Sequence, residues 1–156
     1  MTRTRSQLVV LCVLLALSVT AYGADWPMWR NDASRTGYTA EKLPDALSLR
    51  WTRELHKPAS AWPSTQRKLR FDDSYSAVVA GKLIFVPSMI TESVTAYSTD
   101  TGKTVWTFFA SGPIRFAPVA FKDKLCFVSD DGWIYCVTAA TGKLAWKQRG
   151  GPDNRK

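Results

Sequence analysis

Histidine is nearly absent from this sequence of 156 residues, in which His56 is the only one. Three cysteines are present, and the two outside the N-terminal apolar run, Cys126 and Cys136, stand ten residues apart. Neither feature matches the clusters of cysteine and histidine that hold zinc. No Gly-x-Ser-x-Gly sequence occurs, so the nucleophile of an α/β-hydrolase is not indicated. The sequence thus contains no familiar metal or nucleophile motif.

Carboxylates are also few, with 13 Asp and Glu residues in all. Glu41, Asp72 and Asp73 do not form a placed pair for acid–base chemistry. Asp130 and Asp131 are adjacent and could bind calcium, but a solvated hairpin turn is the interpretation we favour. We therefore assign no catalytic, cofactor-binding or metal-binding residue from the sequence.

The formal net charge is +8, and the basic residues are spread along the chain. The one cluster consists of Arg67, Lys68 and Arg70, which we interpret as a solvated loop. No helix for the major groove and no base-stacking sheet with a basic channel is indicated. Nucleic acid is therefore excluded as an expected partner.

The N-terminus has the layout of a secretory signal peptide. Basic residues at positions 3 and 5 precede an apolar run over 8–19, which includes Cys12, and Ala21-Tyr22-Gly23 follows it. The run is short for a membrane span. We predict that residues 1–23 are a signal peptide, that the protein is periplasmic or secreted, and that no membrane span remains after cleavage. An uncleaved N-terminal anchor is the alternative.

A repeated cassette is the most informative feature that is present. Thr101-Gly102-Lys103-Thr104-Val105-Trp106 recurs as Thr141-Gly142-Lys143-Leu144-Ala145-Trp146, so the two tryptophans lie 40 residues apart. The apolar runs upstream also match, at 82–86 and 124–128. A period of about 40 residues built from short strands is typical of a propeller blade.

Each copy contains four apolar segments that predict strands. In the first copy these cover 76–79, 83–86, 94–97 and 104–108, and in the second 117–121, 125–129, 133–137 and 144–147. The segment 83–86 is continuously apolar, which indicates a strand covered on both faces. Sheets stacked around a central axis bury both faces in this way.

Glycines predict the turns. Gly102 and Gly142 are expected to adopt positive φ between the third and fourth strands. Asp131-Gly132 is interpreted as a two-residue hairpin turn. That turn would place residue 126 opposite 137, so Cys126 and Cys136 would project from opposite faces as small buried hydrophobic residues, without a disulfide.

The segment 47–55 alternates apolar and polar residues around Trp51, as the fourth strand of a blade would. Because no three partner strands precede it, we interpret it as a ring-closing strand. The expected organisation is a signal peptide (1–23), an N-terminal extended segment (24–46), the ring-closing strand (47–55), a long loop (56–74), two blades (75–110 and 111–150) and a truncated connection (151–156).

The pattern Ala-x-x-x-x-Thr-Gly-x-x-x-Trp resembles the pyrroloquinoline-quinone (PQQ) repeat. Ala96 opens the pattern in the first copy, whereas Cys136 stands at that position in the second. The segments 26–37 and 129–136 are similar to the same family. No Trp-Asp dipeptide occurs, which favours this family over WD40 propellers. The resemblance implies an all-β propeller whose blades each have four antiparallel strands. Propellers of this family have eight blades. About two are present here, which indicates a fragment of a larger propeller.

Function follows less directly from this resemblance. Family members that bind PQQ assemble the site from several blades around calcium, so PQQ and calcium are expected only in a full-length propeller. We expect an exported binding or scaffold module without a catalytic site, whose partners are its missing blades and an envelope protein or polymer. The alternative is the N-terminal part of a PQQ-dependent quinoprotein dehydrogenase. A third hypothesis is a small stand-alone secreted domain. Two stacked blades would leave an apolar sheet face exposed at each end, together with unpaired strand edges, so we expect the chain to self-associate. This expectation conflicts with the third hypothesis.

Overall fold

The computed structural model describes residues 24–66 and 71–150. The predicted signal peptide, the cluster of Arg67, Lys68 and Arg70, and the connection over 151–156 lie outside these residues. Within the described ranges, no helix is long and apolar enough to cross a membrane.

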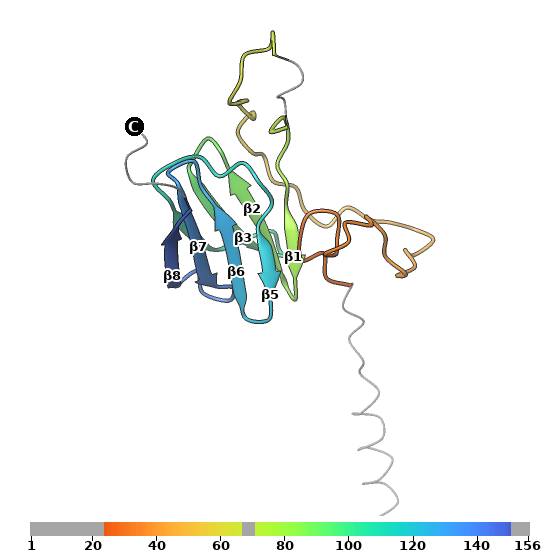
Figure 1. Cartoon of the computed structure of the whole chain (residues 1–156). Coiled ribbons are helices and arrows are strands. Elements are labelled where there is room, and N and C mark those ends of the chain that lie inside the picture. The colour runs from red at the N-terminus through yellow and green to blue at the C-terminus, as the bar shows by residue number, and fades with distance from the viewer. Residues whose placement is uncertain (1–23, 67–70, 151–156) are drawn as a thin grey trace, which may run out of the picture.

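The described chain forms two four-stranded antiparallel sheets, ordered β1-β2-β3-β4 and β5-β6-β7-β8 (Figure 1). The strands of the first sheet are β1 (Val78–Ala80), β2 (Leu83–Ser88), β3 (Ser93–Ser98) and β4 (Thr104–Phe109). Those of the second sheet are β5 (Val119–Phe121), β6 (Lys124–Val128), β7 (Trp133–Thr138) and β8 (Leu144–Arg149). All eight predicted strands are present, with their ends shifted by no more than two residues.

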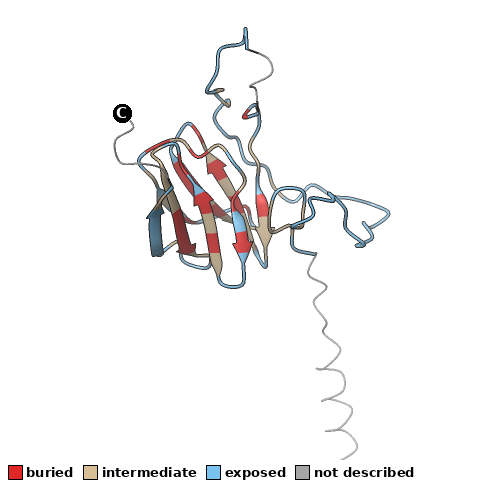
Figure 2. Cartoon of the chain, in the orientation of Figure 1, coloured by how far each residue is buried: buried red, intermediate tan, exposed pale blue. Residues whose placement is uncertain are grey.

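The two sheets pack face to face, with most buried residues between them (Figure 2). One row of paired positions across the first sheet is buried: Val78, Phe85, Ala96 and Trp106. The second sheet contributes Ala120, Leu125, Phe127, Tyr135 and Val137 to the same core. Phe108 joins them through edge contacts, with ring centroids 5.6 Å from Phe127 and 5.4 Å from Tyr135. Apolar burial and offset aromatic packing therefore hold the sheets together.

A tryptophan from one repeat docks on the Thr-Gly turn of the next. Trp106 Nε1 donates to the carbonyl of Ala139 at 2.9 Å, and its ring lies against Gly142. Trp51 makes the same contacts one repeat earlier, donating to the carbonyl of Thr99 at 2.8 Å and lying against Gly102. Trp51 therefore packs on the Thr-Gly turn of the first sheet in the same way as Trp106 packs on that of the second sheet.

The segment around Trp51 is not a strand in the structure, although its alternating pattern predicts one. A strand needs a neighbouring strand for its backbone hydrogen bonds, and none of the described strands pairs with residues 47–55. Arg53 adds a contact, because its Nε donates to the carbonyl of Gly102 at 2.6 Å. The segment is thus attached through side chains, and ring closure by it stays a prediction.

Close approach of the Trp106 ring makes Gly142 a sensitive turn position. A Cβ atom there would lie 2.6 Å from the Trp106 ring, whereas one at Gly81 would meet nothing within 4 Å. Both glycines have positive φ, of 69° and 58°. We expect Gly81→Ala to cost about 1 kcal/mol of unfolding free energy from backbone strain. Gly142→Ala should cost about 1–3 kcal/mol more, because the ring must move.

Chemical denaturation of both variants measures this difference. Because the two substitutions impose the same backbone strain, Gly81→Ala is the matched control. Equal losses of unfolding free energy in the two variants would show that the Trp106 ring tolerates a side chain at position 142.

The register of the β6–β7 hairpin differs from the prediction. Cys126 pairs directly with Cys136, not with Val137. The turn is longer than two residues, because Gly132 N donates to the carbonyl of Ser129 and Ser129 N donates to that of Trp133. This is a three-residue loop with glycine in the left-handed region at its end. One extra loop residue shifts the register by one, so the predicted placement of the two cysteines on opposite faces is wrong.

The N-terminal segment contacts the first edge strand of each sheet, β1 and β5. Trp26 exchanges two backbone hydrogen bonds with Val79 in β1, and the carbonyl of Pro27 accepts one from Ala120 in β5. β1 and β5 are themselves neighbours (Figure 1). The segment thereby places Met28 and Trp29 beside the start of β5.

Candidate functional site

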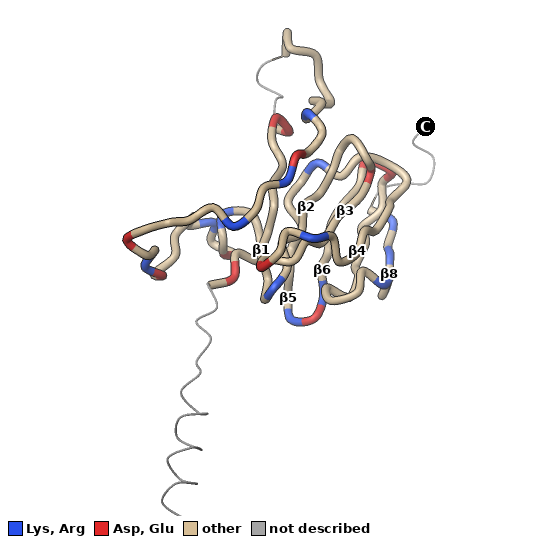
Figure 3. The backbone as a smooth tube through the Cα atoms, turned by 180° about the vertical axis from the view of Figure 1, so that it is seen from behind, with Lys and Arg blue, Asp and Glu red and all other residues tan. Residues whose placement is uncertain are grey.

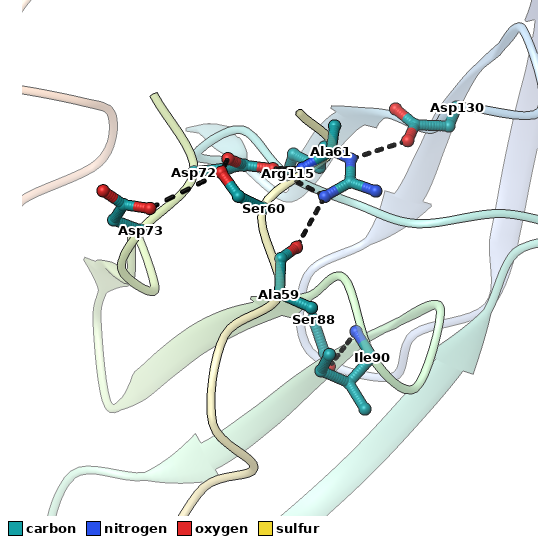
Figure 4. Close-up of polar contacts among 9 residues, drawn as sticks. All are labelled: Ala59, Ser60, Ala61, Asp72, Asp73, Ser88, Ile90, Arg115 and Asp130. Carbon is teal, nitrogen blue, oxygen red and sulfur yellow. Dashed lines mark hydrogen bonds and ion pairs between the residues drawn. The ribbon is translucent and has the colours of Figure 1, made fainter. Parts of the chain in front are cut away.

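Arg115 lies at the centre of a polar network between the long loop and the second sheet, in which Asp72 is fully buried (Figure 4). Its Nη1 donates to Asp72 Oδ2 at 2.6 Å and to the carbonyl of Ala59 at 3.0 Å. Its Nε donates to Asp130 Oδ2 at 2.7 Å. Asp72 also accepts from Ser60 Oγ and from the backbone N–H of Ala61. The network attaches both ends of the segment 59–72 to the connection between the sheets.

Burial and hydrogen bonding act in opposite directions on Asp72. Its side chain is fully buried, and burial alone would raise its pKa. The hydrogen bonds from Ser60, Ala61 and Arg115, together with the charge of Arg115, outweigh burial and leave the pKa of Asp72 below its ordinary value. Burial likewise tends to lower the pKa of Arg115, but its two carboxylate partners raise it overall. Asp72 and Arg115 are therefore both ionised, and their opposite charges compensate each other.

The two neighbouring aspartates proposed for a hairpin turn are engaged by protein donors. Asp130 pairs with Arg115, as described above. Asp131 Oδ1 accepts from the N–H of Trp133, and its Oδ2 accepts from Tyr135 Oη at 2.6 Å. Burial raises the pKa of Tyr135 to about 12, and the hydrogen bond to Asp131 adds to the rise. These carboxylates thus organise the hairpin and its contact with the loop.

The remaining candidates from the sequence are dispersed. Glu41 accepts a hydrogen bond from Ala24 N, and Asp73 accepts a 3.5 Å bond from Ser60. His56 lines a pocket of about 260 Å³ on the far face of the first sheet. Among the described residues, no three His, Cys, Asp or Glu side chains are grouped so that they could hold a metal ion.

A larger pocket of about 540 Å³ adjoins Arg115. It is lined by Met28, Trp29, Arg35, Phe71, Ser76, Arg115, Phe116, Ala117 and Val119. Phe71 and Phe116 stack in parallel with ring centroids 5.2 Å apart. The guanidinium of Arg35 lies 5.4 Å from the centroid of the Trp29 ring. The pocket therefore combines aromatic walls with a cationic rim.

The aromatic walls remain open to solvent although they are large and apolar. Trp29 is 51% exposed, and Phe71 and Phe116 are each 52% exposed. Along the described backbone, the Lys and Arg positions are spread over several elements (Figure 3). This pocket thus combines three half-exposed rings with Arg35 and Arg115.

The sequence did not point to Arg115 or to the pocket. Asp72 and Arg115 are 43 residues apart, and neither lies in a recognisable motif. Trp29 lies in the segment 26–37 that resembles the family, but Phe71 and Phe116 are single residues in connections. The one available signal was the arginine within Pro113-Ile114-Arg115-Phe116-Ala117-Pro118, a charged residue in an otherwise apolar link between two blades.

The sequence profile of the family described as outer membrane protein assembly factor BamB matches residues 19–155. The chain belongs to this family. The PQQ-repeat resemblance inferred from the Thr-Gly-Trp cassettes is therefore confirmed. No curated protein sequence matches the chain.

Two solved structures with TM-scores above 0.5 show the same fold at low sequence identity. Quinohemoprotein alcohol dehydrogenase from Comamonas testosteroni has a TM-score of 0.58 and 20% identity, and the match covers 89% of this chain and 21% of that one. A europium-containing methanol dehydrogenase also scores 0.58, with 17% identity over 84% of this chain and 24% of its own. BamB from Moraxella catarrhalis scores 0.44, with 23% identity over 47% and 24% of the two chains.

This chain thus spans about a quarter of the length of these solved structures. The all-β fold with four-stranded propeller blades is confirmed.

Proposed function

We propose that this chain is part of an exported propeller that acts as a binding or scaffold module in the cell envelope. The surface that binds is the pocket walled by Trp29, Phe71 and Phe116. The observation that carries the proposal is the half-exposure of all three rings around one hollow. Aromatic side chains and arginine are enriched where protein interfaces have most of their binding energy.

The chemistry of the pocket favours binding over catalysis. The residues that line it include no histidine, cysteine or carboxylate, so general acid–base catalysis has no donor or acceptor of suitable pKa there. Arg115 lines the pocket, and its guanidinium already has two carboxylate partners. The aromatic walls suit an apolar side chain, and Arg35 suits an acidic group beside it.

The family description fits a protein partner, because it names an assembly factor for outer membrane proteins. A periplasmic location agrees with this description and with the signal peptide proposed for residues 1–23. The proposed occupant is accordingly an extended protein segment that carries an apolar residue next to an acidic one.

A displayed library of short peptides tests this proposal. Peptides selected on the chain should carry an apolar residue near Asp or Glu. The double change Trp29→Ala and Phe116→Ala should weaken their binding by more than about tenfold. Phe109→Ala is the matched control, because Phe109 is 68% exposed on β4 and does not line this pocket. Equal binding by the double variant would contradict the proposal.

The same protein also tests the alternative, a piece of a quinoprotein dehydrogenase. PQQ and calcium should leave its absorption spectrum and its thermal unfolding unchanged, because the cofactor site of the family needs residues from several blades. A saturable, calcium-dependent shift would favour the dehydrogenase hypothesis over the binding module.

A further inference from the structure

Cys126 in β6 and Cys136 in β7 lie directly opposite one another. They are register partners, and their Sγ atoms are 3.0 Å apart. Both are free thiols in the structure. Two sulfur atoms at this separation are in contact, and no change of backbone register is needed to bring them together.

The backbone at this pair has the geometry that brings opposing side chains closest. Ser129 N donates to the carbonyl of Trp133, which marks a hydrogen-bonded pair at the end of the hairpin. The cysteines lie three positions further along each strand. Because hydrogen-bonded and non-hydrogen-bonded pairs alternate, the cysteines form a non-hydrogen-bonded pair, in which the two strands approach most closely.

The pair lies on the face of the second sheet that is turned away from the first. Its row of register partners is Val119, Cys126, Cys136 and Trp146, equivalent to the buried row of the first sheet. Cys136 is buried, but Cys126 is partly exposed. A reagent in solution can therefore reach the pair through Cys126.

We propose that Cys126 and Cys136 form a disulfide that joins the two central strands of the second sheet when the protein meets a low-molecular-weight disulfide or a thiol-disulfide exchange protein. One cysteine thiolate attacks the oxidant's disulfide, forming a mixed disulfide and releasing one thiol. The second thiolate then attacks the protein sulfur of that mixed disulfide and releases the second thiol. The two cysteines lose two electrons and two protons, which reduce the oxidant.

The raised pKa of the Cys126 thiol limits the rate of this reaction. Burial raises the pKa of the Cys126 thiol to about 12, and its hydrogen bond with Cys136 adds to the rise. The thiolate is the attacking species, so exchange at neutral pH is slow compared with that of an exposed cysteine. The pair consequently stays reduced in a reducing compartment and becomes oxidised during long residence in an oxidising one.

Alkylation and intact-mass measurement test the proposal. A Cys12→Ser background leaves Cys126 and Cys136 as the only thiols. After incubation with oxidised glutathione and denaturation, we expect no alkylation and a mass lower by two hydrogens. Dithiothreitol should restore two alkylated thiols. Two alkylated thiols after long oxidation, stable glutathione adducts or disulfide-linked dimers would each overturn the proposal.

Redox titration separates the effect of the fold from simple proximity in sequence. The equilibrium constant for disulfide formation with glutathione should be at least about tenfold larger in the native protein than in guanidinium, because the strands hold the sulfurs in contact. Cys136→Ser is the matched control and should give only a reversible mixed disulfide at the partly exposed Cys126. Equal constants in the native and unfolded protein would contradict a role for the strand register.

Discussion

Trp106→Ala is expected to lower the free energy of unfolding by about 3–5 kcal/mol. The Trp106 side chain is 9% exposed, and its ring lies 5.7 Å from the ring of Phe85. Its removal would leave a cavity between the two sheets and take the hydrogen bond from the carbonyl of Ala139. The same change at Trp146, the equivalent position of the second repeat, should cost less than about 1 kcal/mol, because Trp146 is 46% exposed.

Guanidinium unfolding followed by circular dichroism measures both losses. Trp146 is the matched control, since it is also a tryptophan, lies in the equivalent strand of its sheet and is the same distance from a Thr-Gly turn. Losses of equal size would show that docking on the next repeat contributes nothing to stability.

The open face that contains Trp146 has a second consequence. Val119, Phe121 and Val128 are exposed on the same side of the second sheet. Exposed apolar sheet surface promotes association. Trp146→Ala should therefore also reduce self-association of the chain in sedimentation, whereas Trp106→Ala should not.

Arg115→Met is expected to cost about 3–5 kcal/mol of unfolding free energy at neutral pH. The change removes the cation beside Asp72, whose carboxylate is fully buried. It also frees the carbonyl of Ala59 and one oxygen of Asp130. Arg50→Met is the matched control, because Arg50 and Asp100 form an ion pair with side chains 70% and 58% exposed. That exposed pair should contribute less than about 1 kcal/mol.

The loss should depend on pH. In the native protein the pKa of Asp72 is below its ordinary value, so its contribution to stability is present above about pH 4 and is lost as pH falls through the native pKa. Without Arg115, one hydrogen bond and one positive charge that lower the pKa of Asp72 are lost, so this pKa is higher than in the native protein. The stability difference between the native protein and Arg115→Met should therefore shrink in acid.

A double-mutant comparison completes this test. Adding Asp72→Asn to Arg115→Met removes the uncompensated charge and should recover part of the lost stability. If Arg115→Met cost no more than Arg50→Met, or if Asp72→Asn recovered nothing, the buried pair would not be the source of the loss.

Local patterns predicted most of the fold. The Thr-Gly cassettes located β4 and β8, and the apolar runs upstream located the strands that pair with them. Gly102 and Gly142 have the positive φ that their turns were expected to need. These features depend on residues within a few positions of one another, so they can be recognised in a single sequence.

The candidate site was far less predictable. Asp72 was considered as a carboxylate and set aside, and Arg115 carried no motif. Their contact joins residues 43 positions apart through a connection without regular structure. The pocket depends in the same way on Trp29, Phe71 and Phe116, which come from three separate segments.

By itself the sequence determined that this protein is built from PQQ-like propeller blades, because the repeat period, the strand pattern and the turn glycines all agree. Tertiary structure alone decided three other features. These are the docking of Trp51 on the first sheet, the ion pair under the long loop and the pairing of Cys126 with Cys136. Each depends on the distance between segments or on a single residue of loop length, and a small change in either alters which side chains meet.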